Sequence, residues 1–222
     1  RRTMNYLFKR KLIHLLYPNR CPVCGEVIGA NDRFCTDCEG KLTEFSGSFT
    51  ISGAVMALAV YEYDANIKPA VILLKNGTCG NAAYALGTAL AEKLKAVEST
   101  EKWDFIVPVP MHRKAMRKRG YNQSELIGRE VGRVLNIPLC RCVAKTVSTA
   151  DQKTLGYEER RKNLKGAFTV TENVRGRNLL LIDDVCTTGS TFAEITAALL
   201  KNGAASVTCA ACCKTVQSND TK

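Results

Sequence analysis

The chain has no long apolar run. No stretch of its 222 residues approaches the roughly 20 consecutive apolar residues that a membrane-spanning helix needs, so we expect no transmembrane segment. Near the N-terminus, Lys9, Arg10 and Lys11 interrupt the apolar run where the central region of a secretion signal would be continuous, and we expect no signal peptide there. The composition, 45% apolar and 24% charged, is typical of a folded globular protein.

Acidic residues are scarce relative to basic ones. The chain has 21 Asp and Glu against 32 Lys and Arg, which gives a formal net charge of +11. This excess favours polyanionic partners, either nucleic acid or a phosphorylated small molecule. A merely solvated basic surface is the alternative, but the charge is unevenly spread: five basic residues and no acid fall within Arg113–Arg119.

The cysteines do not suggest a disulfide framework. There are 11, an odd number, and four of them form two CxxC pairs. This pattern favours a reducing compartment, so we expect a cytoplasmic protein.

The two CxxC pairs predict a structural zinc site within residues 19–45. A segment this short cannot build an apolar core, so metal ligation would supply its folding energy. A redox pair is the alternative, but it does not explain two matched pairs, and no Trp-Cys context is present. The expected ligands of one tetrahedral Zn²⁺ are Cys21, Cys24, Cys35 and Cys38.

Residues 1–18 predict an amphipathic basic helix. Its apolar positions are Met4, Phe8, Leu12, Leu15 and Leu16, with basic residues between them. Such a helix can touch a membrane surface or nucleic acid. We expect instead that its apolar side packs on the domain that follows.

Residues 50–216 predict one α/β domain, with 51–98 partly covering it and 217–222 forming a frayed tail. Apolar runs ending in turn residues indicate strands, and segments with a helical period indicate helices. The expected strands are 54–63, 105–111 as the first strand of the main sheet, one beginning at 136–139, 168–170, one leading into Asp183, and 206–213. The expected helices are 67–75, 82–94, 124–135 and one after Thr191.

Two features mark a ligand site. Asp183 and Asp184 end an apolar strand, and Thr187–Thr191 leads into a helix, which is where an open α/β sheet binds ligands and where a helix N-terminus suits phosphate. The basic run Arg113–Arg119 also follows a strand, where we expect a loop, so we favour an anion-binding wall over a solvated charge run. Lys75 is equally consistent with a site residue and an exposed helix end. The polar segment 145–166 predicts a lid or binding loop, or else disorder.

Several stretches together resemble one family. They are LLLIDDVCTTGST at 179–191, VPVPMHRKAMRKRGYNQ at 107–123 and TVSTADQKTLGYEERRKNLKGAF at 146–168, preceded by the four-cysteine segment. The first resembles the signature of type I phosphoribosyltransferases, and the set resembles their ComF (GntX-like) branch. The resemblance implies a parallel-sheet type I phosphoribosyltransferase core with a small N-terminal zinc-ribbon-like module.

The resemblance implies that the ligand is phosphoribosyl pyrophosphate with Mg²⁺. Asp183 and Asp184 would be the catalytic pair, accepting from the ribose hydroxyls. Thr187 stands where 6-oxopurine transferases carry an aspartate, which argues against hypoxanthine or guanine as acceptor and leaves the acceptor open. The implied ligand-binding residues are Thr187, Thr188, Gly189, Ser190 and Thr191 for the 5-phosphate, Pro110, Met111, His112, Arg113 and Arg119 for pyrophosphate, and Gln152 and Arg160 on a closing loop.

The ComF branch also implies a role in DNA uptake and natural transformation. Single-stranded DNA would then contact Arg117, Lys118 and Arg119, and other competence proteins would be further partners. Two alternatives stay open: a phosphoribosyl pyrophosphate-sensing regulator without turnover, and a nucleotide-salvage transferase without a DNA role. The oligomeric state is also open.

Overall fold

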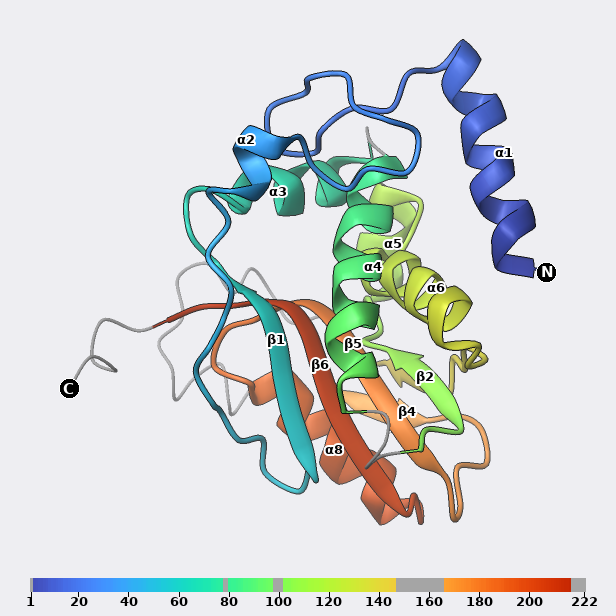
Figure 1. Cartoon of the computed structure of the whole chain (residues 1–222). Helices are drawn as coiled ribbons and strands as arrows, with labels where there is room; N and C mark the ends of the chain where they lie inside the picture. The colour runs from blue at the N-terminus through green and yellow to red at the C-terminus, as the bar shows by residue number, and fades with distance from the viewer. Residues whose placement is uncertain (1, 78–79, 98–101, 147–165, 217–222) are drawn as a thin grey trace.

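A four-stranded parallel sheet forms the centre of the protein (Figure 1). The computed structural model describes residues 2–77, 80–97, 102–146 and 166–216. The strand order is β1-β6-β5-β2. The strands of this sheet are β1 (Met56–Glu62), β2 (Phe105–Pro108), β5 (Asn178–Cys186) and β6 (Ser206–Lys214), and the second sheet is an antiparallel pair, β3 (Val143–Lys145) and β4 (Phe168–Val170).

Helices cover both faces of the parallel sheet because β5 is apolar on both. Leu180 and Ile182 belong to the core on one face, and Leu179 and Leu181 belong to the core on the other. The sequence of a strand that is buried on both faces is a continuous apolar run, and residues 179–182 form such a run. One face carries α4 (Gly80–Lys95) and α6 (Gln123–Leu135), and the other carries α8 (Ser190–Lys201).

Two expectations about the sheet need correction. The strand at 105–111 is not the first of the main sheet, because β1 pairs in parallel with β6 at the opposite edge. Residues 136–139 form no strand of their own and give only a bridge from Leu139 to Ile106. Strand β5 contains the two acids near its carboxyl end, as expected: Asp183 pairs with Ala211 of β6, and the strand continues to Cys186.

Segment 51–98 contributes more to the core than to a cover. It supplies β1, then α3 (Lys68–Asn76), and then α4, whose residues 81–91 are all buried. Alanine-rich α4 packs closely on α6 because small side chains let two helices approach. At Gly87 an added Cβ would meet Glu130 Cβ of α6 at 2.6 Å. Two parts of this segment reach the predicted ligand site: the end of α3, and Ile51 with Ser52 beside the loop after β5.

The four-cysteine module packs on the core through its own apolar side chains. Phe34 meets Tyr61 of β1 edge-to-face, with ring centroids 6.2 Å apart. Asn81 at the start of α4 donates to the carbonyls of Arg20 and Arg33. The module also contains the short helix α2 (Thr36–Glu39). These contacts fix the module on one face of the domain.

Helix α1 (Arg2–Leu16) lies at the periphery, and our expectation for its packing was wrong (Figure 1). Its contacts with the body are polar: Tyr6 donates to Glu130 and Arg10 donates to Asn81. Its apolar side is exposed, with Phe8, Leu12, Leu15 and Leu16 facing solvent. None of the helices in the described parts of the chain has the length and apolarity of a membrane span.

Candidate functional site

The two acids of β5 have separate partners. Asp183 Oδ1 accepts from Ser124 Oγ at 2.7 Å and from the backbone N–H of Asp184 at 2.9 Å. Asp184 is buried, and its Oδ2 lies 2.9 Å from Lys75 Nζ. Alternation along a strand sends neighbouring side chains to opposite faces, so the pair presents carboxylates in two directions.

Lys75 is therefore not an ordinary exposed helix end, because its side chain pairs with Asp184 of the candidate site. It is in the last turn of α3, which ends at Gly77 in the left-handed conformation with φ 77°. The hydroxyl of Tyr121 donates to the Leu74 carbonyl at 2.6 Å and holds this helix end in place. Ser124 was not among the residues that the sequence suggested. It lies on the first turn of α6, and no motif in the sequence signals that it reaches Asp183.

Burial and neighbouring charges set the pKa values of Asp183 and Lys75. Removal from water raises the pKa of Asp183 well above its usual value, and the charge of Asp184 raises it further, while the Ser124 hydrogen bond opposes both effects. At Lys75, burial lowers the pKa but the charge of Asp184 outweighs it, so the net pKa is raised. The lysine thus stays cationic beside Asp184.

The loop after β5 has the geometry of an anion cradle. Gly189 is the N-cap of α8 with φ 78°, and a Cβ there would collide with Ile51 Cδ1. The hydroxyls of Thr188 and Ser190 lie 2.8 Å apart, and the first-turn N–H groups of α8 have no partner within the helix. A hollow of about 370 Å³ opens beside the loop, walled by Thr50–Ser52 and the first two turns of α8. The sequence-predicted set Thr187–Thr191 thus lies together.

The basic run after β2 forms a helix, not the loop that we expected. Helix α5 (Arg113–Arg119) begins at His112, whose Nδ1 accepts from the Lys114 N–H, and it ends at Gly120 with φ 84°. Four of its five basic side chains are exposed, and Arg119 instead donates to Gln123 at 2.6 Å. Arg119 therefore braces the α5–α6 junction, and the exposed basic residues are Arg113, Lys114, Arg117 and Lys118.

The turn between β2 and α5 lines a cavity of about 160 Å³ near the acids. Pro110, Met111 and Arg113, three of the residues that the resemblance assigns to pyrophosphate, contribute to its lining. Asn122 fixes the geometry by donating to the Val109 carbonyl at 2.9 Å while it caps α6. Two cations that sequence reasoning missed, Arg141 and Lys145, complete the wall. Gln152 and Arg160, the predicted lid residues, lie outside the described residues.

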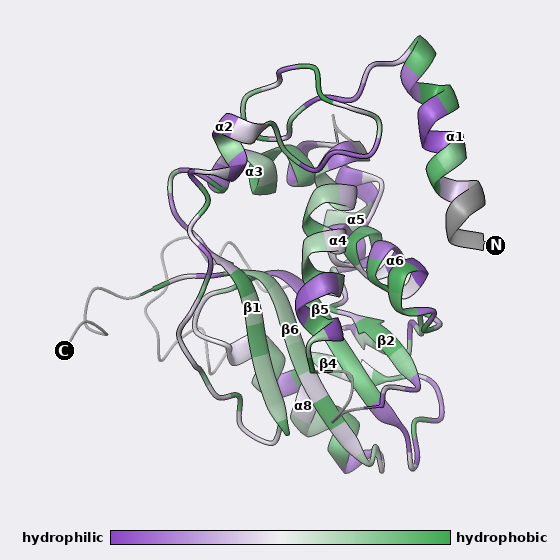
Figure 2. Cartoon of the chain, viewed as in Figure 1, coloured by the Kyte–Doolittle hydropathy of each residue, from purple (hydrophilic) through white to green (hydrophobic). Residues whose placement is uncertain are grey.

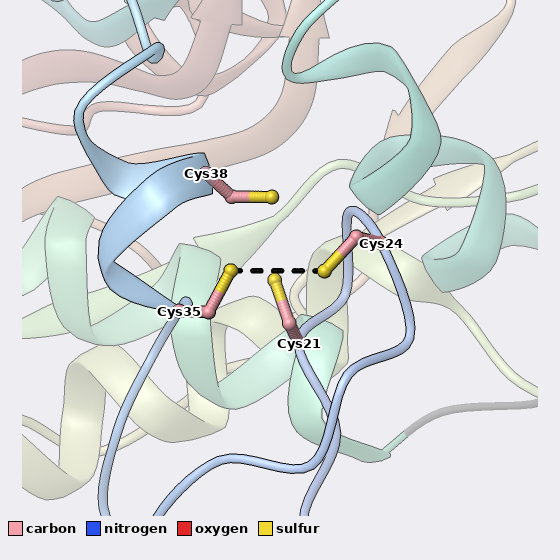
Figure 3. Close-up of side chains that lie close together, drawn as sticks. All are labelled: Cys21, Cys24, Cys35 and Cys38. Carbon is pink, nitrogen blue, oxygen red and sulfur yellow. Dashed lines mark hydrogen bonds between the residues drawn. The ribbon is translucent and has the colours of Figure 1, made fainter.

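The four cysteines form a separate metal centre (Figure 3). Their sulfur atoms all lie within 4.8 Å of one another, and those of Cys24 and Cys35 are 3.6 Å apart. Tetrahedral Zn–S bonds of ~2.3 Å place sulfurs ~3.8 Å apart, so the cluster fits Zn²⁺. Burial disfavours the thiolate of Cys21, but backbone N–H groups of Cys24, Cys35 and Val23 lower its pKa to about 7. The site is closed by four protein ligands, which is typical of structural zinc.

Two family models match this chain in its two parts. The model described as a phosphoribosyl transferase domain matches residues 80–222, and the model described as a double zinc ribbon domain matches residues 12–49. The first agrees with the parallel sheet, the acid pair and the phosphate loop, and the second agrees with the cysteine cluster. Fold and site thus define a phosphoribosyltransferase-type α/β protein with a zinc-ribbon module.

Similar proteins of known name narrow the class of protein further. DNA utilization protein YhgH of Escherichia coli O6:H1 is 34% identical over 203 residues, which cover 88% of this chain and 84% of that protein. Competence protein F of Haemophilus influenzae is 39% identical over 45% of each chain, and competence protein ComFC of Bacillus subtilis is 27% identical over 83% of this chain and 73% of that protein. The chain belongs to the phosphoribosyl transferase domain family, in the group that contains YhgH and these competence proteins, as the sequence resemblance implied.

Proposed function

We propose that this chain is a cytoplasmic protein that binds phosphoribosyl pyrophosphate with Mg²⁺ and acts on single-stranded DNA during DNA uptake. The observation that carries the first part is the placement of the acid pair, Asp183 and Asp184, at the carboxyl end of β5, directly before the phosphate loop. The acids would accept hydrogen bonds from ribose hydroxyls, and the α8 N-terminus with the Thr188 and Ser190 hydroxyls would bind the 5-phosphate. The DNA part rests on the names of the relatives and on the exposed basic face of α5.

The two acids are better suited to accept hydrogen bonds from ribose hydroxyls than to enclose a metal ion as its ligands. Asp184 is already neutralised by Lys75 and Asp183 is held by Ser124, so Mg²⁺ would be carried mainly by the oxygens of the ligand, as is usual for this ion. Bound there, Mg²⁺ would neutralise charge on the departing pyrophosphate. Of the chain's own residues, the turn Pro110–Arg113 would contact that leaving group. Lys145 would add positive charge beside it, whereas Arg141 is paired with Glu125.

Calorimetry with phosphoribosyl pyrophosphate and Mg²⁺ tests the ligand. Wild type should give binding heat, and the isosteric variant Asp183→Asn/Asp184→Asn should lose it. Asp104→Asn is the matched control because it removes a carboxylate at the other end of the sheet, where Asp104 bonds to the Asn178 N–H. Absence of heat for wild type contradicts ligand binding altogether. Pyrophosphate release across a panel of bases and oligonucleotides then separates a transferase from a regulator that binds without turnover.

A gel-shift series with single-stranded oligonucleotides tests the DNA role. Arg117→Ala/Lys118→Ala should weaken binding and make it less dependent on salt, because each phosphate that is no longer neutralised lowers the logarithmic slope by ~0.7. Arg175→Ala/Lys201→Ala is the control, because it removes the same charge from exposed positions at the opposite end of the sheet. It should change the affinity and its salt dependence only by a general charge effect. Equally weakened binding in the two variants would rule out a specific role for α5.

A further inference from the structure

The outward side of α1 is an apolar surface with no partner among the described residues. At about 100° per residue, Phe8, Leu12, Leu15 and Leu16 fall on one side of the helix, and Tyr6, Arg10 and His14 fall on the opposite side. The solvent-exposed fraction is 60% for Phe8, 78% for Leu15 and 79% for Leu16, whereas the opposite side is half-buried. Figure 2 shows hydrophobic segments along α1, at the edge of the molecule.

Polar contacts hold the helix in this orientation. Tyr6 Oη donates to Glu130 Oε1 at 2.7 Å, and Arg10 donates to Asn81 Oδ1 at 2.9 Å and to the Ala30 carbonyl at 3.0 Å. The Arg10 guanidinium also stacks over the Tyr84 ring, 3.5 Å from its centroid. Turning the apolar side inward would break each of these contacts. The exposed surface is therefore the arrangement that the body of the protein favours.

The charges around the apolar side indicate what would cover it. Lys9 and Lys11 flank the stripe on its two sides, both are exposed, and residues 2–16 contain no acid. Long lysine side chains beside an apolar stripe can reach anionic groups above while their stems stay along the apolar surface. A helix with an apolar side, flanking lysines and its other side held by protein matches an interfacial helix. Tyr17, exposed just after the end of α1, is a residue type that suits a membrane–water interface.

We propose that the outward side of α1 docks the protein on the surface of a lipid bilayer that contains anionic lipid. The four apolar side chains enter the boundary between headgroups and acyl chains, and Lys9 and Lys11 pair with lipid phosphates. Docking through α1 leaves the phosphate loop, which lies at the carboxyl end of the sheet on other elements, outside the contact. The surface is independent of the ligand and DNA sites proposed above.

Co-sedimentation of the full chain with vesicles tests the proposal. Wild type should bind vesicles of phosphatidylcholine with phosphatidylglycerol and bind phosphatidylcholine alone far more weakly. Leu12→Gln/Leu16→Gln keeps every charge and alters only exposed side chains, so it should reduce the partition coefficient at least about tenfold. Val55→Gln/Ile72→Gln is the matched control, since both are exposed apolar residues outside α1, just before β1 and on α3, and it should bind like wild type.

Two further variants measure separately how the lysine charges contribute to vesicle binding and whether α1 inserts into the bilayer. Lys9→Glu/Lys11→Glu should weaken binding to the anionic vesicles by about tenfold or more. In a Leu12→Trp variant, tryptophan emission should shift to the blue when vesicles are added, against the constant contribution of buried Trp103. Vesicle binding that survives Leu12→Gln/Leu16→Gln would overturn the proposal, because general basic charge would then explain it. A solution dimer that this variant dissociates, with no vesicle binding by wild type, would overturn it in favour of self-association.

Discussion

Replacing Lys75 by methionine tests whether the pair with Asp184 organises the site. The substitution keeps the length of the side chain and removes its charge, so the buried Asp184 carboxylate loses the cation 2.9 Å away. Breaking a fully buried pair typically costs ~3–5 kcal/mol, and a surface pair contributes ~1 kcal/mol or less. The Lys75 side chain is 35% exposed and that of Asp184 is 6% exposed, so the pair lies between these cases.

We therefore expect Lys75→Met to lower the free energy of unfolding by roughly 2 kcal/mol, which corresponds to a melting temperature ~4–8 °C lower for a chain of this size. Urea unfolding followed by the fluorescence of Trp103, the single tryptophan of the chain, measures the change in the core. Lys68→Met is the matched control: it removes an exposed lysine from the other end of α3 and should change stability by less than about 0.5 kcal/mol.

The double variant Lys75→Met/Asp184→Asn should recover much of the stability, because it removes the unpaired charge as well. The sign of the pH dependence follows from the raised pKa of Lys75: its stabilising charge is fully present below the ordinary lysine value of ~10.4 and is lost as pH rises through the higher folded value. The difference between wild type and Lys75→Met should thus stay constant across neutral pH. If Lys75→Met unfolds like wild type at pH 7.5, or if the double variant shows no coupling, the pair does not organise the site.

Three further predictions follow from the same geometry. Burial and Asp184 raise the pKa of Asp183, so the contribution of the Asp183 carboxyl to stability is present below its ordinary pKa of ~3.9 and is lost as pH rises. Asp183→Asn should therefore be more stable than wild type by roughly 0.5–2 kcal/mol at pH 8, and the two stabilities should converge near pH 4. A lower melting temperature of the variant at pH 8 would contradict this. Gly189→Ala should destabilise by more than the ~1–2 kcal/mol of left-handed strain, because its added methyl group would collide with Ile51, whereas Gly176→Ala, with φ 69° and open space, should show the strain alone in urea unfolding. Cys38→Ser should abolish stoichiometric zinc in metal analysis and open residues 19–45 to trypsin while the core fluorescence stays native; retained zinc would exclude Cys38 as a ligand.

Local patterns were sufficient for features whose cause is local. The apolar run 179–182 indicates a strand buried on both faces, and the small residues after it indicate a turn into a helix; both are present. The zinc prediction succeeded for a related reason, since two CxxC pairs bring four thiols together almost regardless of what surrounds them. The family resemblance added the class of fold, which residue patterns alone left at α/β.

Other features depended on residues that are far apart in the chain. Strand order could not be read from the sequence, because β1 looks alike whether it pairs with β6 or stands apart as a cover. The position of Arg113–Arg119 after a strand predicts a loop, because that position does not reveal that His112 and Gly120 cap a helix at its two ends. The resemblance assigns Arg119 to a ligand, although its nearest partner is Gln123, four residues along the chain.

The sequence by itself determined where the acids and the phosphate loop lie along the chain and which four cysteines gather, because strand alternation, turn chemistry and ligand spacing act over a few residues. Only the tertiary structure decided that Lys75 and Ser124 hold the two acids, since α3 and α6 reach β5 only after the sheet has formed. It also decided which side of α1 faces outward. A helical period identifies the apolar side of a helix, but the side that packs inward depends on the partners it meets, and here Glu130 and Asn81 bind the polar side.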